Sequence, residues 1–120
     1  MSFPLAPFRV SSAQILDEIY VVAAAGELDV DSVPELRREL EPILAAGTRA
    51  LVLDLLEVTF VDSAALALVT AVAASLRSRG GRLVLASDSI ATRRIFEVTG
   101  LVREIEVAPS LKAAVESVAV

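Results

Sequence analysis

The chain has 120 residues, of which 55% are hydrophobic, a formal net charge of −5, and neither histidine nor cysteine. This length suits one core, so residues 1–120 are expected to form a single domain, and the acidic balance argues against nucleic-acid binding, which depends on clustered Lys and Arg. The missing His and Cys exclude a Ser-His-Asp triad, a thiolate nucleophile and an ordinary zinc or iron site, so no metal or cofactor is expected.

The first third of the chain predicts strands followed by a helix. A short N-terminal strand is expected around residues 8–10 or 14–16, and the run YVVAAA at residues 20–25 predicts a strand that Gly26 ends. The segment SVPE at residues 32–35 fits a capping box that begins a helix. The apolar stripe of that helix consists of Leu36, Leu40, Ile43 and Leu44, and Gly47 ends it.

The middle of the chain contains the most continuous apolar run. The sequence ALVLDL at residues 50–55 predicts a central strand, and EVTFVD at residues 57–62 reads as a connector. A helix is expected to begin at Ser63, with an apolar stripe of Leu66, Val69, Val72, Ala73 and Leu76.

The last third repeats the pattern of strand and helix. RLVLA at residues 82–86 predicts a strand, and Asp88 or Ser89 can cap a third helix that ends at Gly100. REIEV at residues 103–107 predicts a short edge strand, and Pro109 and Ser110 precede a last helix. The expected fold is therefore α/β, an open and mostly parallel sheet of four or five strands with about four helices packed on it.

The apolar segments are too short to cross a membrane. The longest weakly interrupted run, residues 64–76, falls well below the ~20 residues that a spanning helix needs. The N-terminus, MSFPLAPFRV, has no basic segment followed by an apolar core, so we expect no secretory signal. The sequence predicts a soluble cytoplasmic protein without membrane insertion.

The stretch FVDSAALALV at residues 60–69 places Ser63 between a carboxylate and an apolar helical run. Three roles are open for this serine: a helix cap, a nucleophile, or a site of phosphorylation. A nucleophile would lack the usual base, and no Gly-rich loop followed by Lys-Ser or Lys-Thr is present to hold a nucleotide. We therefore expect no enzymatic activity and no catalytic residue.

Three segments together resemble a known family, the STAS domain, which bacterial anti-sigma factor antagonists share with the cytoplasmic tails of sulfate transporters. They are GELD at residues 26–29, LDLLEVTFVDSAAL at residues 53–66 and IFEVTGL at residues 95–101. The family pattern at the second segment is commonly Asp-Ser-Ser/Thr-Gly-Leu, and its first serine, which is phosphorylated, corresponds to Ser63. This chain keeps Asp62, Ser63 and Leu66 but has Ala64 and Ala65 where the second hydroxyl and the glycine usually stand.

The resemblance implies a switch protein of the anti-sigma factor antagonist type. Such a protein binds an anti-sigma factor that is itself a serine kinase, and thereby releases a sigma factor; phosphorylation of Ser63 would break the complex, and a serine phosphatase would restore it. Asp29, Asp62, Ala64 and Ala65 would form the partner-binding surface, with both alanines exposed and the Ala65 methyl narrowing the approach of the kinase. The alternative is a STAS scaffold or accessory subunit of a stress-sensing or transporter complex, in which Ser63 is not switched. The oligomeric state stays open.

Overall fold

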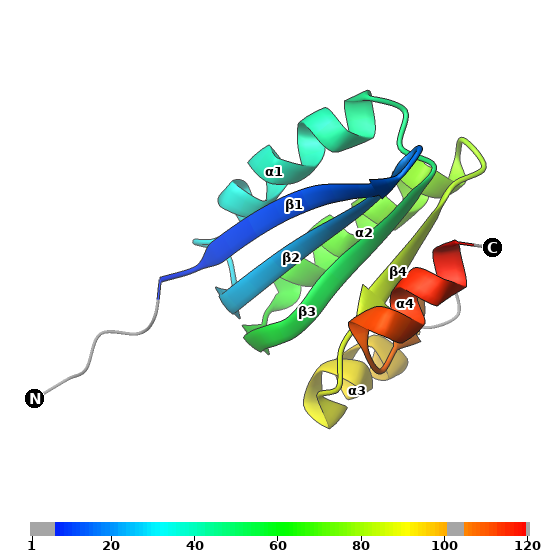
Figure 1. The fold of residues 1–120 in the computed structure, drawn as a ribbon. Helices are drawn as coiled ribbons and strands as arrows, with labels where there is room; N and C mark the ends of the chain where they lie inside the picture. The colour runs from blue at the N-terminus through cyan, green and yellow to red at the C-terminus, as the bar shows by residue number, and fades with distance from the viewer. Residues whose placement is uncertain (1–6, 101–104, 120) are drawn as a thin grey trace, which may run out of the picture.

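The elements of the protein alternate between strands and helices, as Figure 1 shows for a computed structural model that describes residues 7–100 and 105–119. They are β1 (Arg9–Leu16), β2 (Ile19–Leu28), α1 (Val33–Ala45), β3 (Ala50–Val61), α2 (Ser63–Arg77), β4 (Arg82–Ala86), α3 (Ile90–Val98), β5 (Glu106–Ala108) and α4 (Leu111–Val118). The expected α/β class is confirmed, and none of the helices in the described ranges is long and apolar enough to cross a membrane.

The strands form one five-stranded sheet in the order β1-β2-β3-β4-β5. β1 pairs with β2 in the antiparallel sense, and the other three pairings are parallel. The prediction of a central strand that includes Val52 and Leu53 is confirmed, because β3 lies in the middle of the sheet and both side chains are almost fully buried. The carboxyl ends of the parallel strands therefore meet at one edge of the molecule.

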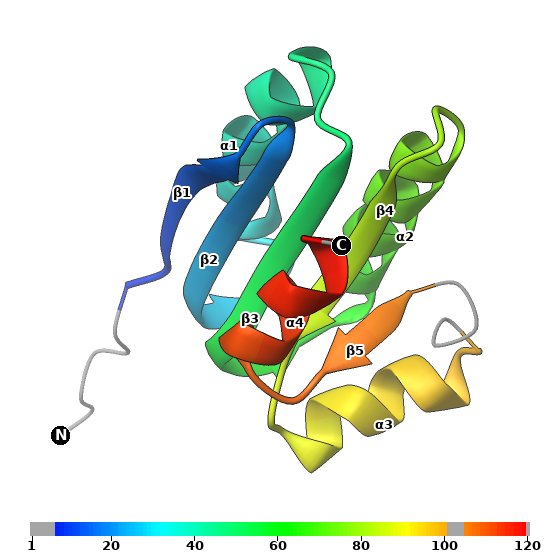
Figure 2. The ribbon, with the colours of Figure 1, turned by 45° about the vertical axis from the view of Figure 1, so that its right-hand side comes forward.

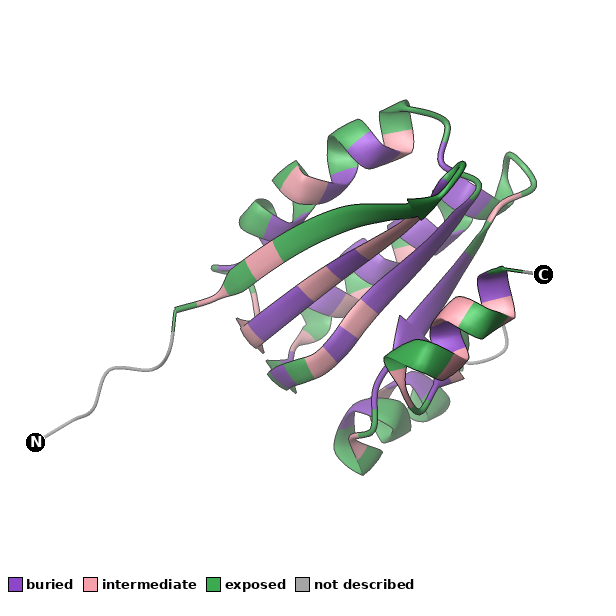
Figure 3. Cartoon of the chain, viewed as in Figure 1, coloured by how far each residue is buried: buried purple, intermediate pink, exposed green. Residues whose placement is uncertain are grey.

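Helices cover both faces of the sheet, because successive side chains of a strand point to opposite sides. One face packs Leu51 and Leu53 against the buried stripes of α1 and α2 and against Phe96 of α3. The other face packs Val52 and its neighbours against α4. Figures 2 and 3 show α2 and α4 on opposite sides of β3 and β4, with the buried residues between the layers.

Two expected strand ends are wrong. Gly26 does not end β2, which continues to Leu28, and residues 57–62 are not a connector, because β3 extends to Val61. The extensions pair with each other, Leu28 opposite Val61, and Gly26 takes the positive φ of 104° beside a register shift in the ladder. Glycine and polar residues after an apolar run favour a turn when they are read alone. Here a neighbouring strand bonds the backbone N–H and C=O groups of these residues, so the strands continue.

The fifth strand is shorter than the sequence predicts. β5 covers Glu106–Ala108, so the expectation is confirmed for residues 106 and 107 and is wrong for Ile105, which lies in a bend, while residues 103 and 104 lie outside the described part of the chain. Leu101, the last residue of the third family-like segment, also lies outside it. Ser89 rather than Asp88 caps α3, since its side chain accepts a hydrogen bond from the amide of Thr92.

Candidate functional site

The junction between β3 and α2 presents Ser63 at the surface. Asp62 has extended backbone angles and its carboxylate Oδ1 accepts a hydrogen bond from the amide of Ala65, 3.0 Å away, so Asp62 is the N-cap of α2. The interpretation of Ser63 as the cap is therefore wrong, because Ser63 is already the first helical residue. Ser63 is exposed, and within the described residues its hydroxyl makes no hydrogen bond.

Asp62 also fastens the loop between β2 and α1 to the start of α2. Its second carboxylate oxygen, Oδ2, accepts a hydrogen bond from the amide of Val30 at 3.0 Å. Its own backbone amide donates to the carbonyl oxygen of Leu28 at 3.2 Å. These two bonds connect segments about thirty residues apart in the sequence, and they hold the loop that carries Asp29 beside Ser63.

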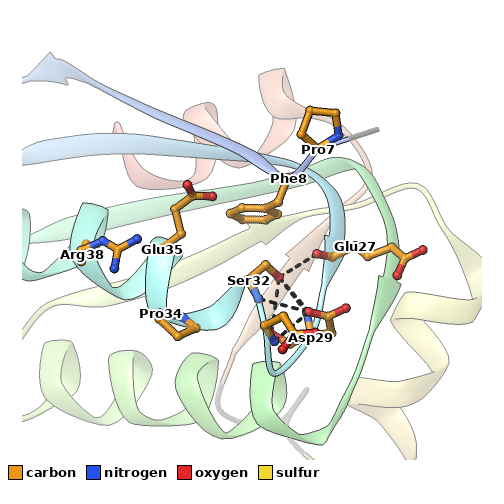
Figure 4. Close-up of a pocket in the computed structure, with 9 residues that line it drawn as sticks. Pro7, Phe8, Glu27, Asp29, Ser32, Pro34, Glu35 and Arg38 are labelled. Carbon is orange, nitrogen blue, oxygen red and sulfur yellow. Dashed lines mark hydrogen bonds between the residues drawn. The ribbon is translucent and has the colours of Figure 1, made fainter. Parts of the chain in front are cut away.

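Asp29 organises its own loop. Its Oδ1 accepts hydrogen bonds from the backbone amides of Asp31 and Ser32, at 2.9 and 3.1 Å. The Ser32 hydroxyl accepts from the Asp29 amide at 2.9 Å and donates to the carbonyl oxygen of Glu27 at 2.7 Å (Figure 4). The capping box expected at residues 32–35 is therefore wrong, because the Ser32 side chain bonds back into the loop and makes no capping bond to α1.

An open pocket lies beside this loop, between the loop, α1 and the segment that leads into β1 (Figure 4). Acidic side chains dominate its charged lining, with Arg38 as the single basic residue. The lining residues are Pro7, Phe8, Glu27, Asp29, Asp31, Ser32, Pro34, Glu35 and Arg38. The pocket adjoins Asp29, and the exposed Ser63 is not among its lining residues.

The two alanines after Ser63 differ in what they contact. The Ala65 side chain is fully buried in the core between α2 and the sheet, and Ala64 is half-buried against the same core. The expectation that Ala65 is exposed to a partner is wrong, because two helical steps of about 100° turn it away from the Ser63 side. Ala65 has no positive φ, so the glycine usual in the family is not required at this position.

The charge around Ser63 is negative. Asp29 and Asp62 lie on the two segments that meet at the junction, and the exposed Asp31 follows on the same loop. The amide groups at the start of α2 offset part of this charge, since a helix N-terminus carries a partial positive charge. The structure thus brings together Asp29, Asp62 and Ser63 as the sequence predicts, although both aspartates also have a structural role.

Val30 was not expected at the site from the sequence; it is 65% exposed, and its backbone amide donates to Asp62. The signal that could have found it is a β-branched apolar residue inside the polar turn ELDVD. Phe60, at the end of β3, is also exposed. The junction therefore combines apolar side chains with acidic ones, as protein-binding surfaces do.

Comparisons with known proteins identify the family and the fold. Residues 11–114 match the family model of the STAS domain. An anti-sigma-B factor antagonist of Staphylococcus aureus is 38% identical over 85 residues, which cover 71% of this chain and 79% of that protein. The crystal structure of an anti-sigma factor antagonist from Mycobacterium paratuberculosis superposes with a TM-score of 0.86 at 28% identity, covering 95% of this chain and 96% of that one. The Bacillus cell fate determinant SpoIIAA in its phosphorylated form has the same fold, with a TM-score of 0.74 at 23% identity, over 92% of this chain and 99% of that one.

Proposed function

Since the chain belongs to the STAS domain family, we propose that it is an anti-sigma factor antagonist that binds an anti-sigma factor serine kinase and is released when Ser63 is phosphorylated. When the antagonist binds the kinase, the sigma factor is free for transcription. When phosphorylation releases the kinase, less sigma factor is free. The protein acts through binding and has no catalytic residue of its own. A serine phosphatase restores the binding form.

The observation that carries this proposal is the state of Ser63. Its hydroxyl is exposed, makes no hydrogen bond within the described residues, and stands at the first position of α2 beside the Asp62 cap. A kinase can therefore reach the hydroxyl without unfolding the domain, and the amide groups at the helix N-terminus can donate hydrogen bonds to a phosphate. The relative named an anti-sigma-B factor antagonist and the phosphorylated form of SpoIIAA support the same interpretation.

The effect of the phosphate follows from the charge at the junction. A phosphoserine adds a charge of about −1.5 to −2 at neutral pH. That charge is placed beside Asp62 and near the loop of Asp29, on a surface that must dock closely with the kinase. Like-charge repulsion and bulk should weaken the complex by a few kcal/mol, which is on the order of a hundredfold or more in affinity.

The test is phosphorylation and binding with the candidate kinase that is encoded nearest to the gene. Mass spectrometry after incubation with Mg-ATP should show one added phosphate on the wild type and none on Ser63→Ala. Calorimetry should show that Ser63→Ala binds like the wild type, while Ser63→Asp and Ser63→Glu bind poorly. Ser75→Ala, an exposed serine further along α2, is the matched control and should be phosphorylated and bind like the wild type. Full labelling of Ser63→Ala, or tight binding of Ser63→Asp, would refute a switch at Ser63.

Recovery of the native complex separates the alternative, a STAS scaffold or accessory subunit. In that case the chain would be recovered in a stable complex with Ser63 unmodified, and Ser63→Asp would leave the complex intact. A membrane transporter subunit and a soluble ATP-binding kinase are readily distinguished in the recovered complex.

A further inference from the structure

One side chain, that of Asp62, joins the two segments that meet beside Ser63. Its Oδ1 accepts a hydrogen bond from the amide of Ala65, and its Oδ2 accepts one from the amide of Val30, each at 3.0 Å. The backbone of Asp62 is held separately, because its own amide donates to the carbonyl oxygen of Leu28 at 3.2 Å. The carboxylate can therefore turn away from both amides while the strand pairing next to it stays in place.

The tip of the loop between β2 and α1, residues 29–31, depends on this carboxylate. The other hydrogen bonds of the loop, made by Asp29 and Ser32, stay within the turn and the residues that flank it (Figure 4). In the described part of the chain, the bond from Val30 to Asp62 is the one hydrogen bond that joins residues 29–31 to the junction of β3 and α2. Val30 is 65% exposed, so packing adds little to that bond.

A phosphate on Ser63 would place a larger negative charge next to the Asp62 carboxylate. Consecutive Cα atoms are about 3.8 Å apart, and a phosphoserine carries a charge of about −1.5 to −2 at neutral pH. Among the described residues Asp62 makes no ion pair with Lys or Arg that would offset this repulsion. The amides of Ser63 and Ala64 make no hydrogen bond to any described residue, so they are donors within reach of the phosphate.

We propose that phosphorylation of Ser63 turns the Asp62 carboxylate away from Val30 and so releases residues 29–31. This inference rests on the proposed function, because it takes Ser63 as the modified residue. Phosphate oxygens can accept from the first amides of α2 in place of the carboxylate, so the helix keeps a cap, whereas the exposed Val30 amide exchanges its acceptor for water. The two forms of the protein then differ in the order of this loop as well as in the charge at Ser63.

The test compares the unmodified protein with the full chain in which phosphoserine is installed at position 63 during synthesis, so that no kinase is needed. Amide hydrogen exchange followed by NMR should show Val30 exchanging about tenfold faster in the phosphorylated protein, because protection reports local opening. The amide of Ala113 is the internal control. It donates to the capping hydroxyl of Ser110 at 3.0 Å, at the start of α4, and should exchange equally in both forms.

Two matched substitutions test whether the Asp62 carboxylate carries the effect. Asp62→Asn removes the charge and one of the two acceptors, so the Val30 amide should exchange rapidly with or without the phosphate. Asp31→Asn removes the same charge from an exposed side chain that accepts no hydrogen bond among the described residues. In that variant phosphorylation should still accelerate the exchange of Val30 by about tenfold.

Equal exchange of the Val30 amide in the phosphorylated and unmodified wild type would overturn the inference. The proposed function would stand if the kinase still bound only the unmodified form. An acceleration in Asp62→Asn as large as in the wild type would also overturn the inference, because the carboxylate would then not carry the effect. Faster exchange of Ala113 would do the same, since the whole domain would be loosened. If the kinase neither phosphorylates Ser63 nor distinguishes the two forms, the proposed function fails, and the loop is no regulatory device even if it opens.

Discussion

Asp62 should stabilise the protein through two separate hydrogen bonds, and substitutions can separate them. Its Oδ1 accepts from the amide of Ala65 and its Oδ2 accepts from the amide of Val30, each at 3.0 Å. Alanine removes both acceptors. Asparagine keeps one carbonyl oxygen, but its amide nitrogen cannot accept a hydrogen bond, so it can replace only one of the two.

The expected loss in the free energy of unfolding follows from these two hydrogen bonds. Loss of an N-cap costs about 1 kcal/mol, with a range of roughly 0.5–2 kcal/mol. The bond to Val30 should contribute about 0.5–1.5 kcal/mol, because Val30 is largely exposed and water can replace the lost acceptor. We expect Asp62→Ala to lower the free energy of unfolding by about 1.5–3 kcal/mol and Asp62→Asn, a good N-cap residue, by about half as much.

Urea unfolding followed by circular dichroism measures the stability difference, and NMR amide exchange identifies which bond is lost. Asp62→Ala should reduce the protection of both the Val30 and Ala65 amides, whereas Asp62→Asn should reduce mainly that of Val30. Asp31→Ala is the control for charge, because the exposed Asp31 side chain accepts no hydrogen bond among the described residues. A cost below about 0.5 kcal/mol for Asp62→Ala, with both amides still protected, would refute the reasoning.

Three further substitutions test the packing around the site and the core. Ala65→Gly should cost about 1–2 kcal/mol in urea unfolding, from helix propensity and a lost buried methyl group, while kinase affinity is unchanged because the Ala65 side chain is fully buried. Gly81→Ala should cost about 3 kcal/mol in thermal unfolding, because an added Cβ would lie 2.3 Å from the carbonyl oxygen of Arg49. Its control is Gly80→Asn, which should cost under about 1 kcal/mol, because the space at Gly80 is open and its φ is 76°. Phe96→Ala should cost about 3–5 kcal/mol, since this ring is fully buried and fastens α3 to the core; an equal cost for Ile90→Ala would contradict that assignment.

The order of elements and the position of the candidate serine could be predicted from the sequence alone. The apolar runs at residues 50–55 and 82–86 are strands because near-continuous β-branched and leucine-rich segments suit a sheet covered on both faces. The helices follow from the 3.6-residue spacing of their apolar positions. Both signals depend only on neighbours along the chain, and so does the placement of Ser63 after Asp62.

The boundaries and contacts at the site were decided by tertiary structure. The segment after residue 55 reads as a connector by itself, and it becomes strand only because the end of β2 lies alongside and satisfies its backbone groups. The local pattern predicted a capping box at Ser32 and left a cap as one of three roles for Ser63, but Ser32 bonds back to Glu27 and Asp62 takes the cap of α2. A side-chain oxygen has several backbone partners within reach, and the path of the whole chain decides which of them is near enough to bond.

The difference between local sequence pattern and tertiary contacts also explains which side chains are buried at the start of α2 and along α3. The sequence determined that Ala64 and Ala65 stand at the start of a helix, but the rotation of α2 against the sheet decides that Ala65 points into the core. The sequence likewise predicted a third helix, and apolar residues in a helix are often buried. Burial depends on what packs opposite: Phe96 meets the sheet, and no described residue covers Ile90 or Val98, so these side chains remain at the surface.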